Sequence, residues 1–453
     1  MPDIEIKIFI QKIKQKPFLW FLIIPFIYKL SIDLFQKKIL KKPKVKFNIP
    51  VIAPLADLEF VPLEFINSYS SSLDKVFLHF EHQTEIDKKD EQLEHYLQRF
   101  NEVIFSEIDQ LTITFNKIQN WIETNPIQKG VAWHSYNVSE RIVNWSIFLS
   151  RFHSNLTHSQ KQIILGSLYQ HGAFLYQNFE HHLGHHNHLI NNSRGLLYAC
   201  AIFKNHDFIN PWRKKSFEVI ETEIKHQILD DGVHAEQSSV YHLLLTRTFW
   251  ELKQLFKILN HPFNYNDCLK NMVTHFKWMI KTNNTVPFLG HITPAIHWKE
   301  LVGLGTVMIK NSSIEKSVYA QLFNPDYIIE EENTNTIKIF SKAGIGILKT
   351  NNTEIYVSND PRCQILSHGD QNQLGVDISW FNTHIIRDTG LDSYNLNDNR
   401  KWFESWQGQS GFTINDINPI VSNWRRKQLP ASHYKATATF ETNNVNTIKA
   451  THH

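Results

Sequence analysis

The chain has 453 residues, of which 42% are hydrophobic and 13% aromatic, and its 47 basic and 44 acidic residues give a net charge of +3. This length predicts two or three domains, because single hydrophobic cores stop growing well below it. The composition excludes disordered and fibrous proteins, and the balanced charge gives no reason to expect a nucleic-acid partner. Three distant cysteines, Cys200, Cys268 and Cys363, indicate neither a disulfide framework nor a cysteine-ligated metal.

Residues 1–50 form a basic and apolar segment in which lysines flank the apolar run 18–28. The run is shorter than the roughly 20 residues of a membrane span, and Pro25 interrupts it. No small residues typical of a signal-peptide cleavage site follow it. Two alternatives remain: a basic interfacial helix pair that makes peripheral membrane contact, or an amphipathic helix packed on the rest of the chain. Localisation stays open between periplasmic, secreted and membrane-associated.

A helical pattern runs from about Glu91 to Asn324. Apolar residues recur at spacings of three and four, as in Leu93, Tyr96 and Leu97, and proline and glycine are sparse inside the periodic stretches. Amphipathic segments joined by short polar links must stack side by side to bury their apolar stripes. We therefore expect residues 51–332 to form an α-helical domain of stacked hairpins.

The pattern changes after the acidic, asparagine-rich link 330–335. Apolar residues now alternate, as in Ile337 and Ile339 or Ile345 and Ile347, and further strand-like runs cover 376–381 and 384–387. Turn signals rich in Asn, Asp and Ser separate these runs. Residues 333–453 are therefore predicted to form an antiparallel β domain.

Three short blocks combine proton-transfer groups with amides. Residues 185–190 (HHNHLI) are either a solvated histidine cluster at a helix end or part of a site, and they lack a carboxylate or cysteine at metal-ligand spacing. In residues 229–242, Asp-Asp-Gly predicts a turn, so Glu236 and Tyr241 would open the next helix, where Tyr241 could also be a packing residue. In residues 367–374, His368 lies on a loop that leads into a strand, a favoured position for a functional histidine.

The order and spacing of these blocks resemble those of the heparinase II/III superfamily of polysaccharide lyases, which includes oligo-alginate lyases. The resemblance also extends to residues 133–145 and to the run 386–395. The separation of Asn187 from Tyr241, 241 − 187 = 54 positions, agrees with the family interval. The matching motifs are Trp133-His134-Ser135, Glu140-Arg141, Asn144-Trp145, Asn187-His188-Leu189, Asp231-Gly232 with Glu236, Ser238, Tyr241 and His242, and residues 368–374 (HGDQNQL).

The resemblance implies an α+β multidomain fold. An N-terminal (α/α) toroid, often incomplete in the family, would pack against an antiparallel β-sandwich, with the active cleft between them. The last residues, 449–453, resemble the middle of the family's sandwich. The β domain is therefore expected to be truncated, which would leave a strand edge that another segment or chain must cover.

The activity implied is β-elimination in a uronic-acid-containing polysaccharide, which leaves a 4,5-unsaturated uronate end. By resemblance, Asn187, helped by His188, would bind the uronate carboxylate and stabilise the charge that develops in it. Tyr241 would transfer protons as phenol or phenolate. His368 would take the C5 proton or assist the tyrosine, because a neutral imidazole is a suitable base near neutral pH.

Other roles and other functions stay open. Arg141 and Glu236 are expected to contact the substrate, although Arg141 could instead be a helix-packing residue. An alternative to the lyase is a catalytically inactive protein that binds or assembles glycans on the same fold. A glycoside hydrolase is a third alternative; it would need two acids, for which Asp230, Asp231 and Glu236 are the candidates.

The sequence departs from the family at the position of its zinc site. Members commonly bind zinc in the sheet domain through His, Asp and His, whereas the corresponding residues here are Asp370, Asp388 and Gln409. A set of oxygen ligands favours a harder cation or none. We therefore expect no zinc cofactor.

Overall fold

The structure is a computed structural model, and the residues it describes are 58–66, 91–127, 130–292, 298–309, 317–323, 325–329, 336–358, 368, 374–391, 398–403, 405–411, 439–443 and 447–451. The expected N-terminal segment, the link 330–335 and Asp370 lie outside these residues, so the domain boundary after residue 332 stays a prediction. The helices and strands below belong to one compact unit that excludes residues 180–184.

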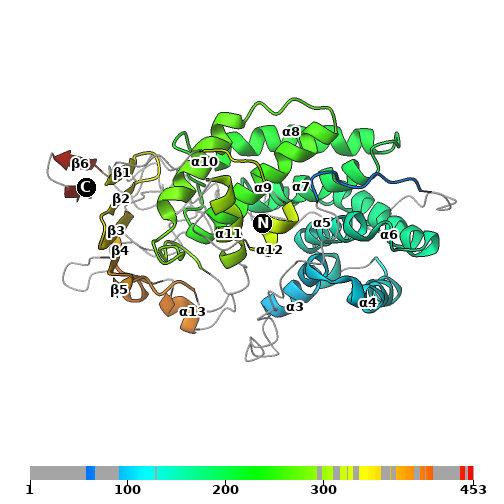
Figure 1. Cartoon of the computed structure of the whole chain (residues 1–453), viewed down its shortest axis with the longest axis horizontal. Coiled ribbons are helices and arrows are strands. Elements are labelled where there is room, and N and C mark those ends of the chain that lie inside the picture. The colour runs from blue at the N-terminus through cyan, green and yellow to red at the C-terminus, as the bar shows by residue number, and fades with distance from the viewer. Residues whose placement is uncertain are drawn as a thin grey trace, which may run out of the picture. The chain divides into compact units, whose positions relative to one another are not determined.

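Of the described residues up to 323, most lie in helices, as the periodicity predicts (Figure 1). Helix α5 packs against α6 and α7, α7 against α8 and α9, and α9 against α10 and α11. No helix among the described residues is long and apolar enough to cross a membrane. The helices are α3 (Glu91–Leu97), α4 (Leu111–Thr124), α5 (Ser135–Phe152), α6 (His158–Gln177), α7 (Asn187–Ile202), α8 (Ile209–Gln227), α9 (Ser239–Ile258), α10 (Asn266–Met279), α11 (Trp298–Met308), α12 (Val318–Phe323) and, after the first sheet, α13 (Asp398–Phe403).

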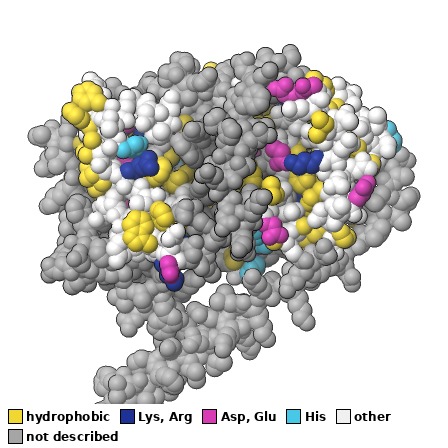
Figure 2. Space-filling model, turned by 90° about the horizontal axis from the view of Figure 1, so that it is seen from below, with side chains coloured by type: hydrophobic (Ala, Val, Ile, Leu, Met, Phe, Trp, Pro, Cys, Tyr) yellow, Lys and Arg dark blue, Asp and Glu magenta, His cyan; other side chains and the backbone are white. Residues whose placement is uncertain are grey.

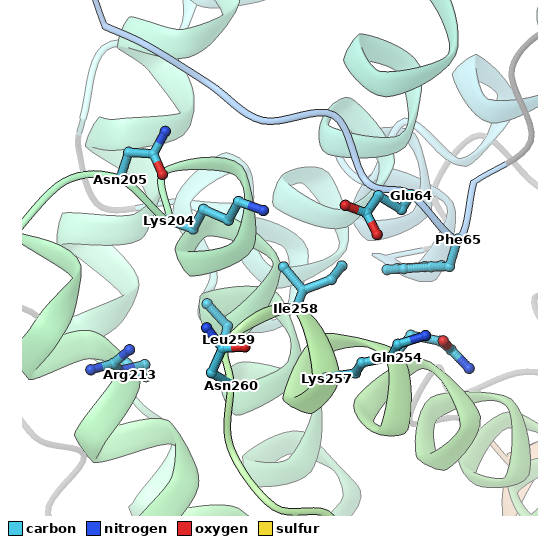
Figure 3. A pocket seen from close by; sticks show the side chains of 10 residues that line it. All are labelled: Glu64, Phe65, Lys204, Asn205, Arg213, Gln254, Lys257, Ile258, Leu259 and Asn260. Atoms are coloured by element: carbon cyan, nitrogen blue, oxygen red, sulfur yellow. The ribbon is translucent and has the colours of Figure 1, made fainter.

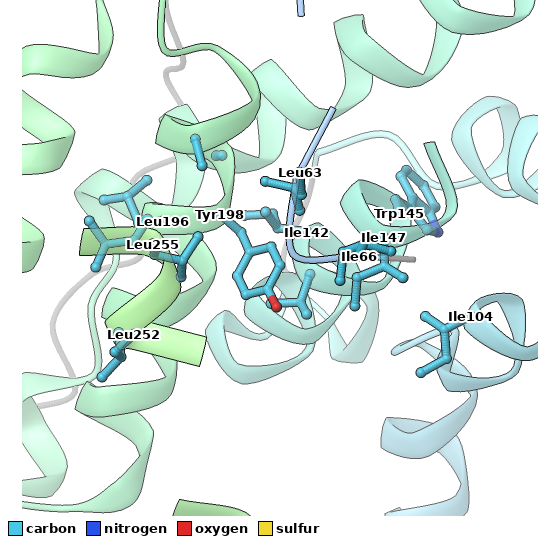
Figure 4. Packing of buried hydrophobic residues seen from close by; sticks show 14 of the residues in the cluster. Leu63, Ile66, Ile104, Ile142, Trp145, Ile147, Leu196, Tyr198, Leu252 and Leu255 are labelled. Carbon is cyan, nitrogen blue, oxygen red and sulfur yellow. The ribbon is translucent and has the colours of Figure 1, made fainter. Parts of the chain in front are cut away.

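The core between these helices is apolar and aromatic. Figure 4 shows the ring of Tyr198 with leucines of α7 and α9 on one side and Leu63 and Ile66 of residues 58–66 on the other. Trp145 of α5 is fully buried in the same core and packs edge-on against Trp121. Burial of so many large side chains is the main force that holds the helices together.

A buried network of charges links three of the helices. Arg194 of α7 forms ion pairs with Glu251 of α9 and with Glu140 of α5, the latter at 2.9 Å. The hydroxyl of Tyr198 donates to Glu251 at 3.1 Å. Because buried charges are tolerated only when they are paired, the network requires α5, α7 and α9 to keep one relative position.

The β region contains a five-stranded antiparallel sheet in the order β1-β2-β3-β4-β5 and a separate hairpin, β6-β7. The strand predictions are confirmed, with differences at the ends of two strands. β4 ends at Trp380, because Phe381 (φ 45°) and Asn382 (φ 62°) form a left-handed turn, and β5 spans Thr383–Ile386 rather than 384–387. The strands are β1 (Ile337–Phe340), β2 (Ile345–Lys349), β3 (Thr353–Ser358), β4 (Gly375–Trp380), β5 (Thr383–Ile386), β6 (Thr439–Asn443) and β7 (Thr447–Thr451).

The sheet is tied to the helices by a buried ion pair. Lys281, just after α10, bonds to Asp377 of β4, and both side chains are fully buried. The same ammonium donates to Ser379 at 3.1 Å, and the backbone N–H of Phe288 donates to Asp377 at 3.3 Å. The alternation of β4 places Asp377 and Ser379 on one face, so that face of the sheet meets the loop after α10.

We expect Asp377→Asn to lower the free energy of unfolding by roughly 3 kcal/mol, because the ammonium of Lys281 would remain buried without a counter-charge. Urea denaturation measures this change. The matched control is Asp398→Asn on α13, where an exposed carboxylate pairs with exposed Lys401 and no measurable change is expected. Equal stability of the two variants would show that the buried pair does not stabilise the chain.

The start of α9 is held by a buried histidine. Ring nitrogen Nε2 of His242 lies 3.0 Å from the carbonyl of Met272 on α10, and Nδ1 accepts from the backbone N–H of His234 at 3.4 Å. This pair of bonds fits only a neutral imidazole, with its proton on Nε2. Burial lowers the pKa of His242 from 6.5 to about 3, although the bond to Met272 opposes the change.

This lowered pKa predicts a loss of stability in acid. Below pH 6.5, His242 is protonated in the unfolded chain but stays neutral in the folded chain. The contribution of this residue to the free energy of unfolding therefore falls by about 2 kcal/mol between pH 7 and pH 5. Unfolding curves measured at both pH values should show that the free energy of unfolding changes less between pH 7 and pH 5 in His242→Gln than in the wild type. The exposed His158 supplies the control His158→Gln; an unchanged pH dependence in His242→Gln would contradict the prediction.

Candidate functional site

The N-terminal ends of two helices and one loop from the β region meet in a cluster of polar side chains. Asn187 is the first residue of α7, Tyr241 lies in the first turn of α9, and His368 precedes β4. All three are at least nine-tenths buried. The structure therefore brings together the amide, the phenol and the imidazole that the sequence singles out, although they are up to 181 positions apart (368 − 187).

The rings of Tyr241 and His368 are stacked. Their centroids are 3.8 Å apart and their planes differ by 14°. The carbonyl of His368 accepts from the backbone N–H of His291 at 2.8 Å. Gly290 makes this approach possible: its φ is +69°, and a Cβ there would lie 2.7 Å from the His368 carbonyl oxygen. The loop 289–291 thus holds His368 against α9.

Glu236 fixes the start of α7. Its Oε1 accepts from the backbone N–H of Asn187 at 2.9 Å, and both carboxylate oxygens lie 3.0 Å from the side-chain Nδ2 of Asn187. A carboxylate at this place also interacts favourably with the positive end of the helix dipole. Glu236 thereby sets the orientation of the Asn187 amide.

Glu236 does not open the next helix, as the sequence suggests, but lies in the loop before it. Helix α9 begins at Ser239, where the hydroxyl of Ser238 accepts from the N–H of Tyr241 at 3.4 Å. Gln237 adopts a left-handed conformation with φ 55°. This turn ahead of the N-cap lets Glu236 reach α7 rather than continue along α9.

Histidines surround the carboxylate of Glu236. The nearest ring nitrogens are those of His368 at 3.3 Å, His186 at 3.5 Å and His234 at 3.9 Å. Burial alone would raise the pKa of Glu236, but these rings and the N–H of Asn187 outweigh it and lower the pKa to about 2. Glu236 is therefore ionised at neutral pH.

His368 is neutral under the same conditions. Burial lowers its pKa well below 6.5; Glu236 opposes the shift, and the neighbouring histidines, with His291 the strongest among them, reinforce it. The site thus pairs a buried anion with an uncharged imidazole. This combination suits proton abstraction, because a base must carry no proton before it can accept one.

Other aromatic rings lie close to the cluster, among them that of His188. The ring of His188 lies 4.6 Å from that of Tyr136 on α5 and 5.3 Å from that of His186. Burial raises the pKa of Tyr136, and the nearby Glu140 and Tyr241 raise it further. His186 stands in the histidine run, but only the folded chain shows that Tyr136 and His291 belong here.

Arg141 does not reach this cluster, which corrects the expectation that it binds substrate. Its side chain is 0% exposed. The guanidinium donates to the carbonyls of Gln98 and Ala132 at 2.6 and 2.8 Å and lies 3.9 Å over the ring of Trp121. The guanidinium is thus bonded and packed inside the helical region, which agrees with the alternative that Arg141 is a helix-packing residue.

The acids proposed for a hydrolase do not form a catalytic pair. Oδ2 of Asp231 accepts from the backbone N–H groups of Lys342 and Ala343 at 2.8 and 3.0 Å. Asp230 has a side chain that is 88% exposed and faces Lys342. Asp231 therefore joins the turn before α9 to the β1–β2 connection, a structural role.

The altered zinc position shows protein contacts at its two described residues. Asp388 is buried and accepts from the N–H groups of Gly390 at 3.1 Å and Ser410 at 3.4 Å, and Nε2 of Gln409 donates to the carbonyl of Phe403. No group of three or more His, Cys, Asp or Glu suited to a metal ion occurs among the described residues. Asp388 is of the family's own ligand type, but Gln409 stands where the family has an imidazole and its amide bonds to a backbone carbonyl, so this position does not fit zinc.

Two family models match the chain and together span more than half of it. Residues 110–295 match the heparinase II/III N-terminus, and residues 332–453 match the heparinase II/III-like C-terminal region. A heparin-sulfate lyase from Bacteroides thetaiotaomicron is 20% identical over 339 residues, which are 66% of this chain and 47% of that protein. One from Pedobacter heparinus is 24% identical over 165 residues, 34% of this chain and 25% of its own length.

Solved structures resemble the fold. A crystal structure of heparinase III superposes with a TM-score of 0.56 at 18% identity, covering 83% of this chain and 65% of the other. A mutant of a heparan sulfate lyase from Pedobacter heparinus gives a TM-score of 0.50 at 15% identity, covering 92% and 68%. The chain spans about half the length of the Bacteroides relative. With both family models matched in order, the chain belongs to the heparinase II/III superfamily.

Proposed function

We propose that this chain is a polysaccharide lyase that cleaves a uronic-acid-containing polymer by β-elimination. The observation that carries the proposal is the 3.8 Å stack of the Tyr241 and His368 rings next to Asn187, whose amide Glu236 holds. The match to both family models supports it. The relatives' names support an acidic polysaccharide as the substrate class.

The reaction breaks the C5–H and C4–O4 bonds of the uronate and forms a C4=C5 double bond. A base takes the C5 proton, and the electron pair of the C5–H bond becomes the second bond between C4 and C5. The C4–O4 bonding pair leaves with O4, which then receives a proton. Both proton carriers must therefore lie near one sugar ring. A phenol and a neutral imidazole in contact meet this requirement.

His368 is proposed as the base, and its tautomer follows from Glu236. An ionised carboxylate can only accept, so its approach to Nε2 of His368 at 3.3 Å favours the tautomer with the proton on that nitrogen. The lone pair is then on Nδ1. Tyr241 would donate the proton that the leaving O4 oxygen needs.

Asn187 and His188 are proposed to bind the carboxylate of the uronate. Negative charge spreads from C5 into this carboxylate in the transition state. Hydrogen-bond donors that are already in position therefore stabilise the transition state more than the ground state. Glu236 holds the Asn187 amide and so would act as a positioning residue rather than a direct substrate ligand. The nearby histidines would offset its repulsion of the substrate carboxylate.

The finer fold is proposed to be the family's toroid and sandwich. On the five-stranded sheet, Ile355 of β3 pairs with Ile378 of β4, and Leu348 of β2 pairs with Ile355. These apolar side chains share the face opposite Asp377 and Tyr356. A sheet with apolar side chains on both faces needs a second layer, and β7 approaches β2.

We expect Tyr241→Phe to reduce turnover of a uronate polymer by about 10²–10⁴-fold, because the variant keeps the ring stack but loses the proton of general acid catalysis. The measurement is the ultraviolet absorbance of unsaturated uronate with heparan sulfate, alginate, glucuronan and hyaluronan, followed by mass spectrometry of the fragments. Tyr176→Phe on α6 is the matched control and should retain full activity.

The products also distinguish the alternatives. Binding without unsaturated fragments, by wild type and variant alike, would favour the non-catalytic glycan-binding protein. Cleavage products that contain no double bond would instead identify a hydrolase. Full activity in Tyr241→Phe would remove the phenol from the mechanism.

A second prediction concerns Glu236. In Glu236→Gln the negative charge that raises the pKa of His368 is lost, so the acid limb of the kcat/KM profile should move to lower pH. Turnover should also fall by about 10²-fold as the imidazole and amide lose their common anchor. The pH profile of Glu218→Gln, an exposed change on α8, serves as the reference. An acid limb that stays in place or moves upward would disprove the role of Glu236.

A further inference from the structure

A polar hollow lies at the other ends of the helices that carry the candidate site. Its volume is about 560 Å³, within the range of pockets that bind small molecules. Figure 3 shows the side chains that line it. They are Glu64, Phe65, Lys204, Asn205, Arg213, Gln254, Lys257, Ile258, Leu259 and Asn260.

The hollow is separate from the Tyr241–His368 cluster. Lys204 follows the C-terminal end of α7, whereas Asn187 begins that helix; Lys257 lies in the last turn of α9, sixteen positions after Tyr241 (257 − 241). At about 1.5 Å per helical residue, each helix separates the two places by roughly 24 Å. The hollow therefore cannot belong to the same sugar-binding position.

Residues 58–66, which precede the helices, form one wall and are bonded to them. The N–H of Val61 donates to the carbonyl of Ile202 at 2.9 Å, and the N–H of Leu63 donates to the hydroxyl of Ser150 at 3.1 Å. Phe65 packs edge-on against Trp250 with centroids 5.8 Å apart. These contacts hold the wall in place through the protein's own groups, so binding there would require little ordering of the chain.

The lining has an excess of positive charge. Lys204, Arg213 and Lys257 come from three different places in the chain, against the single carboxylate of Glu64. In Figure 3 the ammonium of Lys204 and the carboxylate of Glu64 point toward each other across the hollow. Three cations around one hollow attract an anionic group, and a guanidinium binds carboxylate or sulfate with two parallel bonds.

The remaining lining matches the other parts of a sugar. The amides of Asn205, Gln254 and Asn260 can donate to and accept from hydroxyl groups. Phe65 and Ile258 supply apolar surface for the C–H face of a ring. A volume of about 560 Å³ also exceeds what a simple inorganic ion fills.

We propose that this hollow is a non-catalytic binding site for an acidic sugar residue, whose carboxylate or sulfate the cations of the lining attract. The site would hold a second position of an acidic polymer, or a free fragment of one, away from the reacting bond. The proposal goes beyond lyase activity and stands independently of it, since binding here involves neither Tyr241 nor His368.

Calorimetry with Tyr241→Phe protein, which prevents turnover, tests the site with D-glucuronate and a heparin tetrasaccharide. The variant Lys204→Gln/Arg213→Gln, made in the same background, should weaken binding of D-glucuronate by about 100-fold, because two of the three cations of the lining are lost. Lys214→Gln, an exposed change beside Arg213, should leave the affinity unchanged. Added salt should also weaken binding.

Two further ligands decide between outcomes. Glucose tests the need for the negative charge, and inorganic sulfate tests the need for the ring. Equal affinity for glucose and glucuronate, equal affinity for sulfate and glucuronate, or unchanged D-glucuronate binding in the double variant would overturn the proposal. Binding of glucuronate alone indicates a site for free sugar acids, whereas tighter tetrasaccharide binding that the double variant loses indicates a polymer site.

The two proposals fail separately. Turnover of a short oligosaccharide by Lys204→Gln/Arg213→Gln with Tyr241 intact reports only on the cluster around His368. A protein that binds acidic sugars in the hollow yet forms no unsaturated product would refute the lyase and keep this site. The converse result would refute the site and keep the lyase.

Discussion

The buried carboxylate of Glu236 is the constraint on which the candidate site depends. It binds the backbone and amide of Asn187 and lies within 4 Å of three imidazoles. A charge removed from water must be compensated by such neighbours, so the carboxylate, the start of α7 and the loop of His368 have one compatible arrangement. Anything that neutralised Glu236 would release all of them together.

The sequence was sufficient for most of the elements and for three of the residues that the fold brings together in the cluster. Spacings of three and four residues predicted the helices, and alternation predicted β1 to β4, because burial of one face leaves a periodic record in the chain. Tyr241 and His368 were found through the resemblance of their motifs, and Asn187 likewise. The left-handed turn at Phe381 was missed, since phenylalanine carries no signal for a positive φ.

The remaining features depend on contacts between distant segments, which periodicity does not encode. Arg141 has a cationic side chain of the kind that binds acidic substrates, but backbone carbonyls and the ring of Trp121 enclose it. Glu236 was assigned to a helix because the turn at Gln237 is not evident from local residues. Tyr136 and His291 join the site only through tertiary packing, so only the folded chain could identify them.

Under the proposed function the chain binds a polyanion, and the Arg194 network would then have to hold beside that polymer. Such a polymer carries a dense cloud of counterions, and local ionic strength around it is high enough to weaken attraction between charges exposed to water. Arg194 and Glu251 are almost entirely shielded from solvent, where mobile ions do not penetrate. The packing of α5, α7 and α9 would therefore not be weakened by the high ionic strength around the proposed ligand. Ion pairs exposed at the surface would be weakened.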